Sequence, residues 1–117
     1  MSLFKFSVSN LLLLLFCACS SAEIKFEKNT GKTNEVIVGK AFHVNLAENH
    51  STGYSWSLSE GYDFKLLDYV NSVYHSTNSG NVDFNFKALK TGKTELTFIS
   101  RMHTDTGAIK SFVIEIK

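Results

Sequence analysis

Apolar and polar residues alternate along much of the chain, with the period of two that is typical of strands with one buried face. The alternation is clearest in segments 41–46, 54–58 and 82–101, where aromatic or β-branched residues often take every second position. No segment after residue 22 keeps the spacing of an amphipathic helix. The pattern therefore predicts a domain built from strands.

The expected strands are short, and polar or glycine-containing turns separate them. Segment 63–74 is apolar-rich without regular alternation, which indicates either one bent strand or two short ones. Lys90-Thr91-Gly92-Lys93 has the composition of a tight turn between two alternating segments, so it predicts a β-hairpin. The strands are expected at residues 24–28, 35–38, 41–46, 54–58, 63–74, 82–86, 96–101 and 108–116.

Seven or eight short strands predict an all-β, Ig-like antiparallel β-sandwich, because each sheet has one apolar face that must pack against another. The chain has ten phenylalanines, and full burial of one such side chain is worth about 1.5–3 kcal/mol. Six of them are expected to face the core: Phe26, Phe42, Phe84, Phe86, Phe98 and Phe112.

The amino end has the pattern of a secretory signal peptide. Lys5 precedes an apolar run at 11–16, and small residues follow up to Ala22. The run is too short to span a bilayer as a mature helix. We expect residues 1–22 to be a signal peptide and residues 23–117 to be a single domain, secreted or held in lysosomal or phagosomal vesicles, without stable membrane association.

Cys17 and Cys19 are the only cysteines, and both precede the expected cleavage point. Lipid modification of Cys19 is an alternative, although Phe16 and Cys17 fit poorly in front of a lipidated cysteine. After cleavage the domain has no thiol, which excludes a disulfide framework, a cysteine nucleophile and a thiolate metal site. Eleven basic residues then face 11 acidic ones, since one of the 12 is Lys5, so no basic field predicts nucleic-acid binding.

Three polar loops are candidates for function: residues 48–54, 75–81 and 101–107. Connections in a sandwich alternate between its two ends, so loops separated by an even number of strands share an end. With segment 63–74 counted as two strands, we expect all three loops at one end. Such a surface is suited to binding, as antibody loops are.

The loop at Asn49–Tyr54 has residue types that favour a rigid shape. Gly53 allows a positive φ and close approach to another surface, while Asn49 and Thr52 can hydrogen-bond the loop's own backbone. Preorganisation of this kind reduces the ordering cost of association. Trp56, which follows the loop, is expected to be part of the core.

The three loops resemble those of the chagasin-type inhibitors of papain-like cysteine peptidases, which include the amoebiasins. Asn49-His50-Ser51-Thr52-Gly53-Tyr54 is similar to the family's Asn-Pro-Thr-Thr-Gly followed by Tyr or Phe. Thr77-Asn78-Ser79-Gly80 stands where the family has Gly-x-Gly-Gly, and Arg101-Met102-His103 stands where it has Arg-Pro-Trp or Arg-Pro-Phe. The chain has no proline, so its loops lack that constraint on φ.

The resemblance implies a reversible inhibitor with neither enzyme activity nor a cofactor. We expect a monomer, because small sandwiches with blunt, charged edges are often monomeric. The resemblance also implies that the central loop enters the catalytic cleft while the other two loops grip the walls. The peptidase-binding residues would be Asn49, His50, Ser51, Thr52, Gly53, Tyr54, Ser79, Gly80, Arg101, Met102 and His103.

Other interpretations of the same residues stay open. The loop edge could serve a secreted Ig-like adhesion or ligand-binding module, and Arg101 could be a solvated strand end. The four histidines lack metal-ligand spacing, and Ser51 beside His50 has no supporting hydrolase motif, so neither a metal site nor catalysis is expected. Asn49-His50-Ser51 is also an N-glycosylation acceptor triplet, and we expect it to be unmodified in the active form.

Overall fold

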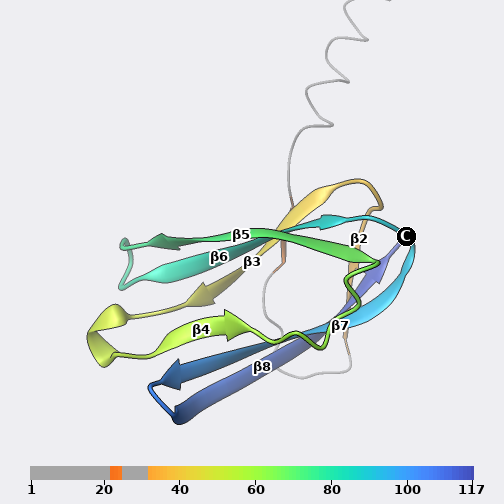
Figure 1. Ribbon diagram of the computed structural model, residues 1–117. Helices are drawn as coiled ribbons and strands as arrows, with labels where there is room; N and C mark the ends of the chain where they lie inside the picture. The colour runs from red at the N-terminus through yellow and green to blue at the C-terminus, as the bar shows by residue number, and fades with distance from the viewer. Residues whose placement is uncertain (1–21, 25–31) are drawn as a thin grey trace, which may run out of the picture.

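The computed structural model describes residues 22–24 and 32–117 and contains eight strands in this part of the chain (Figure 1). A short 3-10 helix, η1 (His50–Thr52), follows the third strand. No helix within the described ranges is long and apolar enough to cross a membrane. The strands are β1 (Ala22–Ile24), β2 (Thr33–Val36), β3 (Ala41–Ala47), β4 (Ser55–Leu58), β5 (Leu67–His75), β6 (Asn81–Ala88), β7 (Gly92–Met102) and β8 (Asp105–Ile116).

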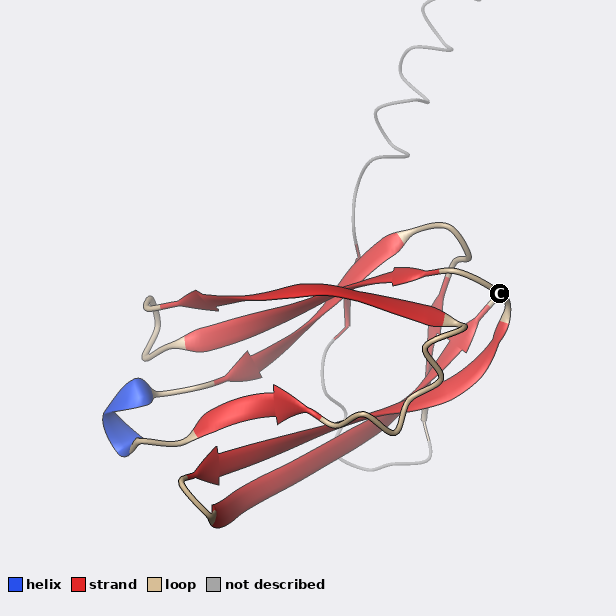
Figure 2. Ribbon diagram, viewed as in Figure 1, coloured by secondary structure: helices blue, strands red, loops and turns tan. Residues whose placement is uncertain are grey.

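The strands form two four-stranded sheets that face each other, with the orders β1-β3-β6-β5 and β2-β8-β7-β4 (Figure 2). The predicted all-β, Ig-like sandwich is confirmed. Pairing among β3 to β8 is antiparallel. The two short amino-terminal strands add parallel edge pairs, β1 with β3 and β2 with β8, which the alternation did not predict.

The core lies between the sheets and is rich in phenylalanine. Phe42 and Phe86 stack within one sheet at a centroid distance of 5.4 Å, and Phe84 meets Phe98 of the other sheet at 4.8 Å. Phe112 packs on Phe98 at 5.7 Å. All five are buried, as their alternation predicted. Phe26 and the rest of the expected strand at 24–28 beyond Ile24 lie outside the described residues, as do residues 1–21 of the expected signal peptide.

Segment 63–74 contains one strand, β5. The prediction that all three loops share one end counted two strands in this segment, and that count was wrong. Asp63 begins a turn in which its carbonyl accepts from the backbone N–H groups of Leu66 and Leu67, and β5 starts only at Leu67. A β-bulge then shifts the register between Tyr69 and Asn71. The bulge breaks the period of two, which is why this segment lacked regular alternation.

The three candidate loops nevertheless share one end of the sandwich (Figure 1). Two strands separate each loop from the next, β4 and β5 in the first case and β6 and β7 in the second. We call these connections loop 1 (48–54), loop 2 (76–80) and loop 3 (103–104). The last is much shorter than the predicted loop at 101–107, because β7 and β8 stay paired up to Met102 and Asp105.

Candidate functional site

Loop 1 is built around η1 and satisfies its own polar groups. Asn49 caps the helix: its side-chain oxygen accepts from the Ser51 backbone N–H at 3.0 Å and from the Ser51 hydroxyl at 2.7 Å. The Thr52 hydroxyl donates to the Asn49 carbonyl at 2.8 Å. The loop therefore has a defined shape in the free protein, as Asn49 and Thr52 predicted.

Gly53 ends this turn in the left-handed conformation, with a φ of 84°. Its N–H donates to the His50 carbonyl at 3.1 Å. A Cβ at this position would lie 3.0 Å from the Met102 sulfur, so the tip of loop 1 packs against the end of β7, next to loop 3. The next residue, Tyr54, covers Gly107 of β8, where an added Cβ would lie 2.8 Å from the tyrosine ring.

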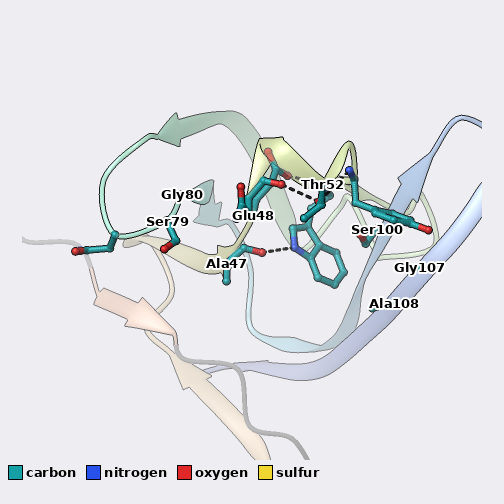
Figure 3. Close-up of a pocket in the computed structure, with 12 residues that line it drawn as sticks. Ala47, Glu48, Thr52, Ser79, Gly80, Ser100, Gly107 and Ala108 are labelled. Atoms are coloured by element: carbon teal, nitrogen blue, oxygen red, sulfur yellow. Dashed lines mark hydrogen bonds between the residues drawn. The ribbon is translucent and has the colours of Figure 1, made fainter.

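The base of loop 1 joins the two sheets, because β3 belongs to one sheet and β4 to the other. Side chains fasten this crossing (Figure 3). The Trp56 indole N–H donates to the Ala47 carbonyl at 2.7 Å, and the Trp56 backbone N–H donates to the Glu48 carboxylate at 2.6 Å. Trp56 is half-buried and packs against the core, as expected from the sequence.

Loop 2 makes a type I′ turn at its tip. The Gly80 N–H donates to the Thr77 carbonyl at 2.9 Å, and the two central residues, Asn78 and Ser79, have φ values of 53° and 68°. Gly80 follows with a φ of 98°. Three successive positive φ angles explain why glycine suits this loop, and Asn78 tolerates the left-handed region better than most side chains.

Gly80, which the sequence predicted to be a peptidase contact, is buried. A Cβ there would lie 2.2 Å from the Glu48 carbonyl oxygen, and the Gly80 carbonyl accepts from the Glu48 N–H at 3.1 Å. Gly80 is thus the point at which loop 2 packs against the base of loop 1. Ser79, beside it, is exposed and available for contact.

Loop 3 is a two-residue connection between β7 and β8. His103 occupies the first position of this turn with a φ of 56°. Glycine is the usual residue at turn positions that need a positive φ. His103 and Arg101 are exposed, whereas Met102 is half-buried against loop 1. Arg101 pairs with Ser55 at the start of β4, which places it close to the end of loop 1.

Loops 1 and 2, together with the adjoining strands, line a cleft of about 510 Å³ (Figure 3). Loop 1 forms one wall with Asn49, Thr52 and Tyr54, and loop 2 contributes Asn78, Ser79 and Gly80. Ala47, Glu48, Trp56, Ser100, Gly107 and Ala108 line the remainder.

The structure thus brings all the predicted site residues to one end. Exposed members are Asn49, His50, Ser51, Thr52, Gly53, Ser79, Arg101 and His103, while Tyr54 and Met102 are half-buried. Among the described residues, no group of three or more His, Cys, Asp or Glu side chains could hold a metal ion.

Glu48 is the residue that the sequence interpretation missed. Its side chain is only 6% exposed although it is acidic. The sequence contains a signal for this burial, because Glu48 occupies the next inward position after Phe42, Val44 and Leu46. A charged residue at such a position indicates a buried carboxylate with partners, since unpaired charges are rarely buried.

Comparison with known proteins gives one family and several similar folds. The model of the chagasin family peptidase inhibitors (I42) matches residues 35–116. No curated protein matches the chain.

The solved structures similar to the chain include the cysteine protease inhibitor EhICP2 from Entamoeba histolytica. It has a TM-score of 0.67 and 18% identity, covering 83% of this chain and 97% of that one. Amebosin has a TM-score of 0.56 and 20% identity, covering 84% and 99% respectively. PbICP-C, solved in complex with falcipain-2, has a TM-score of 0.54 and 15% identity, covering 82% and 98%. At these identities the structures show a shared fold.

Proposed function

The chain belongs to the chagasin family of peptidase inhibitors, and we propose that it blocks papain-like cysteine peptidases by inserting loop 1 into the catalytic cleft. The resemblance to this family inferred from the loop motifs is confirmed, and the protein is an inhibitor, not an enzyme. In the proposed complex, loops 2 and 3 contact the cleft walls on either side of loop 1. The structural similarity to PbICP-C, which is described in complex with falcipain-2, supports this class of target.

One observation carries the proposal: three loops from distant parts of the sequence meet at one end, and the central one is already ordered by its own hydrogen bonds. Such a loop loses little conformational entropy on binding. Its backbone is folded into a helical turn, so the inhibitor offers the enzyme a fixed surface that dissociates intact. Three loops can supply the roughly 800 Å² that a standard interface buries on each side.

The exposed side chains suit the two places proposed for them in the complex: the tip of loop 1, which enters the cleft, and the rim, which contacts the cleft walls. Thr52 and Gly53 at the tip are small, which allows close approach to the catalytic groups. Arg101 and His103 lie at the rim, where a charged or stacking contact adds to affinity. Met102 adapts its shape readily but already packs against Gly53, so its contribution is to hold the tip of loop 1 against the end of β7.

Titration of the purified protein against papain or cathepsin L tests the proposal. Wild-type protein should inhibit at well below micromolar concentration, and Thr52→Trp should raise the inhibition constant by about 100-fold or more, the scale of a central hot spot. Thr91→Trp, in the turn at the opposite end, is the matched control and should inhibit like wild type. Lack of inhibition by the wild-type protein would leave the adhesion or ligand-binding module as the better explanation of the loop edge.

We also propose that residues 1–22 direct the protein into the secretory route, with a mature chain that begins at Glu23. Support comes from the charged, apolar and small-residue pattern described above. Sequencing the amino terminus of the protein recovered from its source tests this proposal. A lipid-modified Cys19 at the amino terminus would contradict it.

A further inference from the structure

Loop 1 differs from the other two loops in having no ladder at its base. Loops 2 and 3 close hairpins, and each follows a paired position: His75 with Asn81, and Met102 with Asp105. The ends of loop 1 belong to different sheets. No backbone ladder therefore joins the two ends of loop 1 to each other, and side-chain contacts across its base contribute to its orientation.

Glu48 is placed to do this. One carboxylate oxygen accepts from the Trp56 backbone N–H at 2.6 Å, and the other lies 2.6 Å from His50 Nε2 and accepts from it. Its own backbone N–H donates to the Gly80 carbonyl at 3.1 Å. A single residue thus contacts the start of β4, the helical turn of loop 1 and the end of loop 2.

His50 extends these contacts to a fourth element. Its ring stacks on Tyr74 of β5, with centroids 3.7 Å apart and planes at 8°. The hydrogen bond to Glu48 and the stacking together hold the first residue of η1 against the sheet that contains β3, β6 and β5. Position 50 is where the family pattern has proline, which would fix φ there without such partners.

We propose that Glu48 is a positioning residue of the inhibitor, which holds loop 1 in its binding orientation through Trp56 and His50 without touching the peptidase. This inference rests on the proposed function of loop 1. The 6% exposure of the Glu48 side chain leaves little surface for direct contact. A buried carboxylate is costly without partners, so the partnered arrangement is strongly preferred over alternatives.

The kinetics of inhibition distinguish positioning from contact. When only a fraction of molecules has the competent loop orientation, apparent affinity falls by that fraction and association slows. Glu48→Ala should therefore raise the inhibition constant about 10- to 100-fold, mainly through the association rate, while the dissociation rate stays within about threefold. Removal of a contact residue would instead act mainly on dissociation.

Two further variants keep the test independent of folding. Glu48→Gln preserves both the acceptor for Trp56 and a group that can pair with His50, so it should restore association to within about threefold of wild type. His50→Ala leaves Glu48 bonded to Trp56 and should slow association by an intermediate factor. Glu35→Ala, at an exposed pair with Lys117, is the matched control and should change neither rate.

Hydrogen exchange supplies a readout in the free protein. In Glu48→Ala the amides of Gly53 and Trp56 should exchange faster by at least about tenfold, while the amides of β6 and β7 keep wild-type protection. Faster exchange throughout would mean that the whole domain is destabilised, and it would overturn the assignment.

The outcomes separate this inference from the proposed function. If wild-type protein does not inhibit papain, the proposed function fails. If wild-type protein inhibits but Glu48→Ala and His50→Ala associate at wild-type rates, the function stands and the positioning role of Glu48 is wrong. A change confined to dissociation in Glu48→Ala would show that Glu48 contacts the peptidase, which also contradicts the inference.

Discussion

Loops 1 and 3 lie at the same end of the sandwich but owe their shapes to different forces. Loop 3 is two residues at the tip of paired strands, so the backbone ladder sets its position up to Met102 and Asp105. Loop 1 crosses between sheets and depends on side chains: Asn49 and Thr52 within the loop, and Glu48 at its base. A few side chains thus do for loop 1 what strand pairing does for loop 3.

This difference explains where the chain keeps the family pattern and where it departs from it. The central motif keeps Asn49, Thr52, Gly53 and Tyr54, each with a specific contact or backbone angle in the structure. The third motif keeps Arg101 alone, and there the pairing of β7 with β8 sets the backbone. Substitutions in loop 1 should therefore change binding more than substitutions in loops 2 and 3.

The largest effect is expected from a glycan on Asn49. Its side chain is exposed at the start of the helical turn, so a glycan there would extend from the segment that must enter the peptidase cleft. Glycosylated protein should show no inhibition at micromolar concentration, and enzymatic removal of the glycan should restore it. Inhibition assays on occupied and unoccupied fractions, with occupancy measured by mass spectrometry, check this.

A glycan at the opposite end is the control. Leu89→Asn creates an acceptor triplet with Thr91 in the turn before β7, and Leu89 is exposed. Protein glycosylated there, with the Asn49 triplet removed by Ser51→Ala, should inhibit within about fivefold of the unglycosylated double variant, because this end lies far from the interface. Full inhibition by protein occupied at Asn49 would eliminate insertion of loop 1.

The next largest effect is expected at Gly80, where loop 2 packs against the base of loop 1. Gly80→Ala places a methyl group against the Glu48 carbonyl in a backbone conformation that alanine disfavours. Overpacking and the positive φ together should lower the free energy of unfolding by about 2–4 kcal/mol. Displacement of Glu48 should also weaken inhibition by about 30-fold, a change of about 2 kcal/mol.

Gly61→Ala is the matched control, because no atom lies within 4 Å of the added Cβ there. Its free energy of unfolding, measured by denaturant titration, should change by less than about 1 kcal/mol. If Gly80→Ala lost stability but inhibited like wild type, loop 2 would not help to position loop 1.

A smaller effect of opposite sign is expected at Ser79. Its φ of 68° is unfavourable for serine, so Ser79→Gly should raise the free energy of unfolding by about 0.5 kcal/mol after the greater freedom of glycine in the unfolded chain is subtracted. Inhibition should stay within about threefold of wild type, since the hairpin ladder already holds loop 2. A fall in stability would mean that the Ser79 side chain makes a contribution that outweighs its backbone strain.

The sequence predicted those parts of the fold in which one strand face is buried. Alternation located β3 and β6 well, because their inward residues are uniformly apolar. It failed at β5, where the bulge beyond Tyr69 shifts the faces. It also failed at the third loop, where the polar residues Asp105 and Thr106 are paired with Met102 and Arg101. Backbone pairing does not depend on side-chain polarity, so composition could not reveal it.

The candidate site was predictable where a motif requires special backbone angles, and less so where contacts come from distant residues. The positive φ of Gly53 and the hydrogen bonding of Asn49 within the loop followed from residue type. The burial of Gly80 depends on Glu48, 32 positions earlier, and the stacking of His50 depends on Tyr74. Such pairs appear only once the two sheets are assembled.

The smallest effect concerns the strand end that carries loop 2. Burial alone would raise the pKa of Asp83, but hydrogen bonds from Asn45 at 2.7 Å and His75 at 2.8 Å, with the charges of His43 and His75, lower it overall. A depressed pKa in the folded state stabilises the fold above the unfolded value of about 4, and this contribution is lost as pH falls through the folded pKa. Asp83→Asn should therefore lower the free energy of unfolding by less than about 1 kcal/mol at pH 6, and the difference should shrink as the pH falls through the pKa of Asp83 in the folded state. Inhibition measured at pH 6 should be unchanged, because the pairing of β5 with β6 still holds loop 2. A marked loss of inhibition would mean that side chains also set the position of this hairpin, as they do for loop 1.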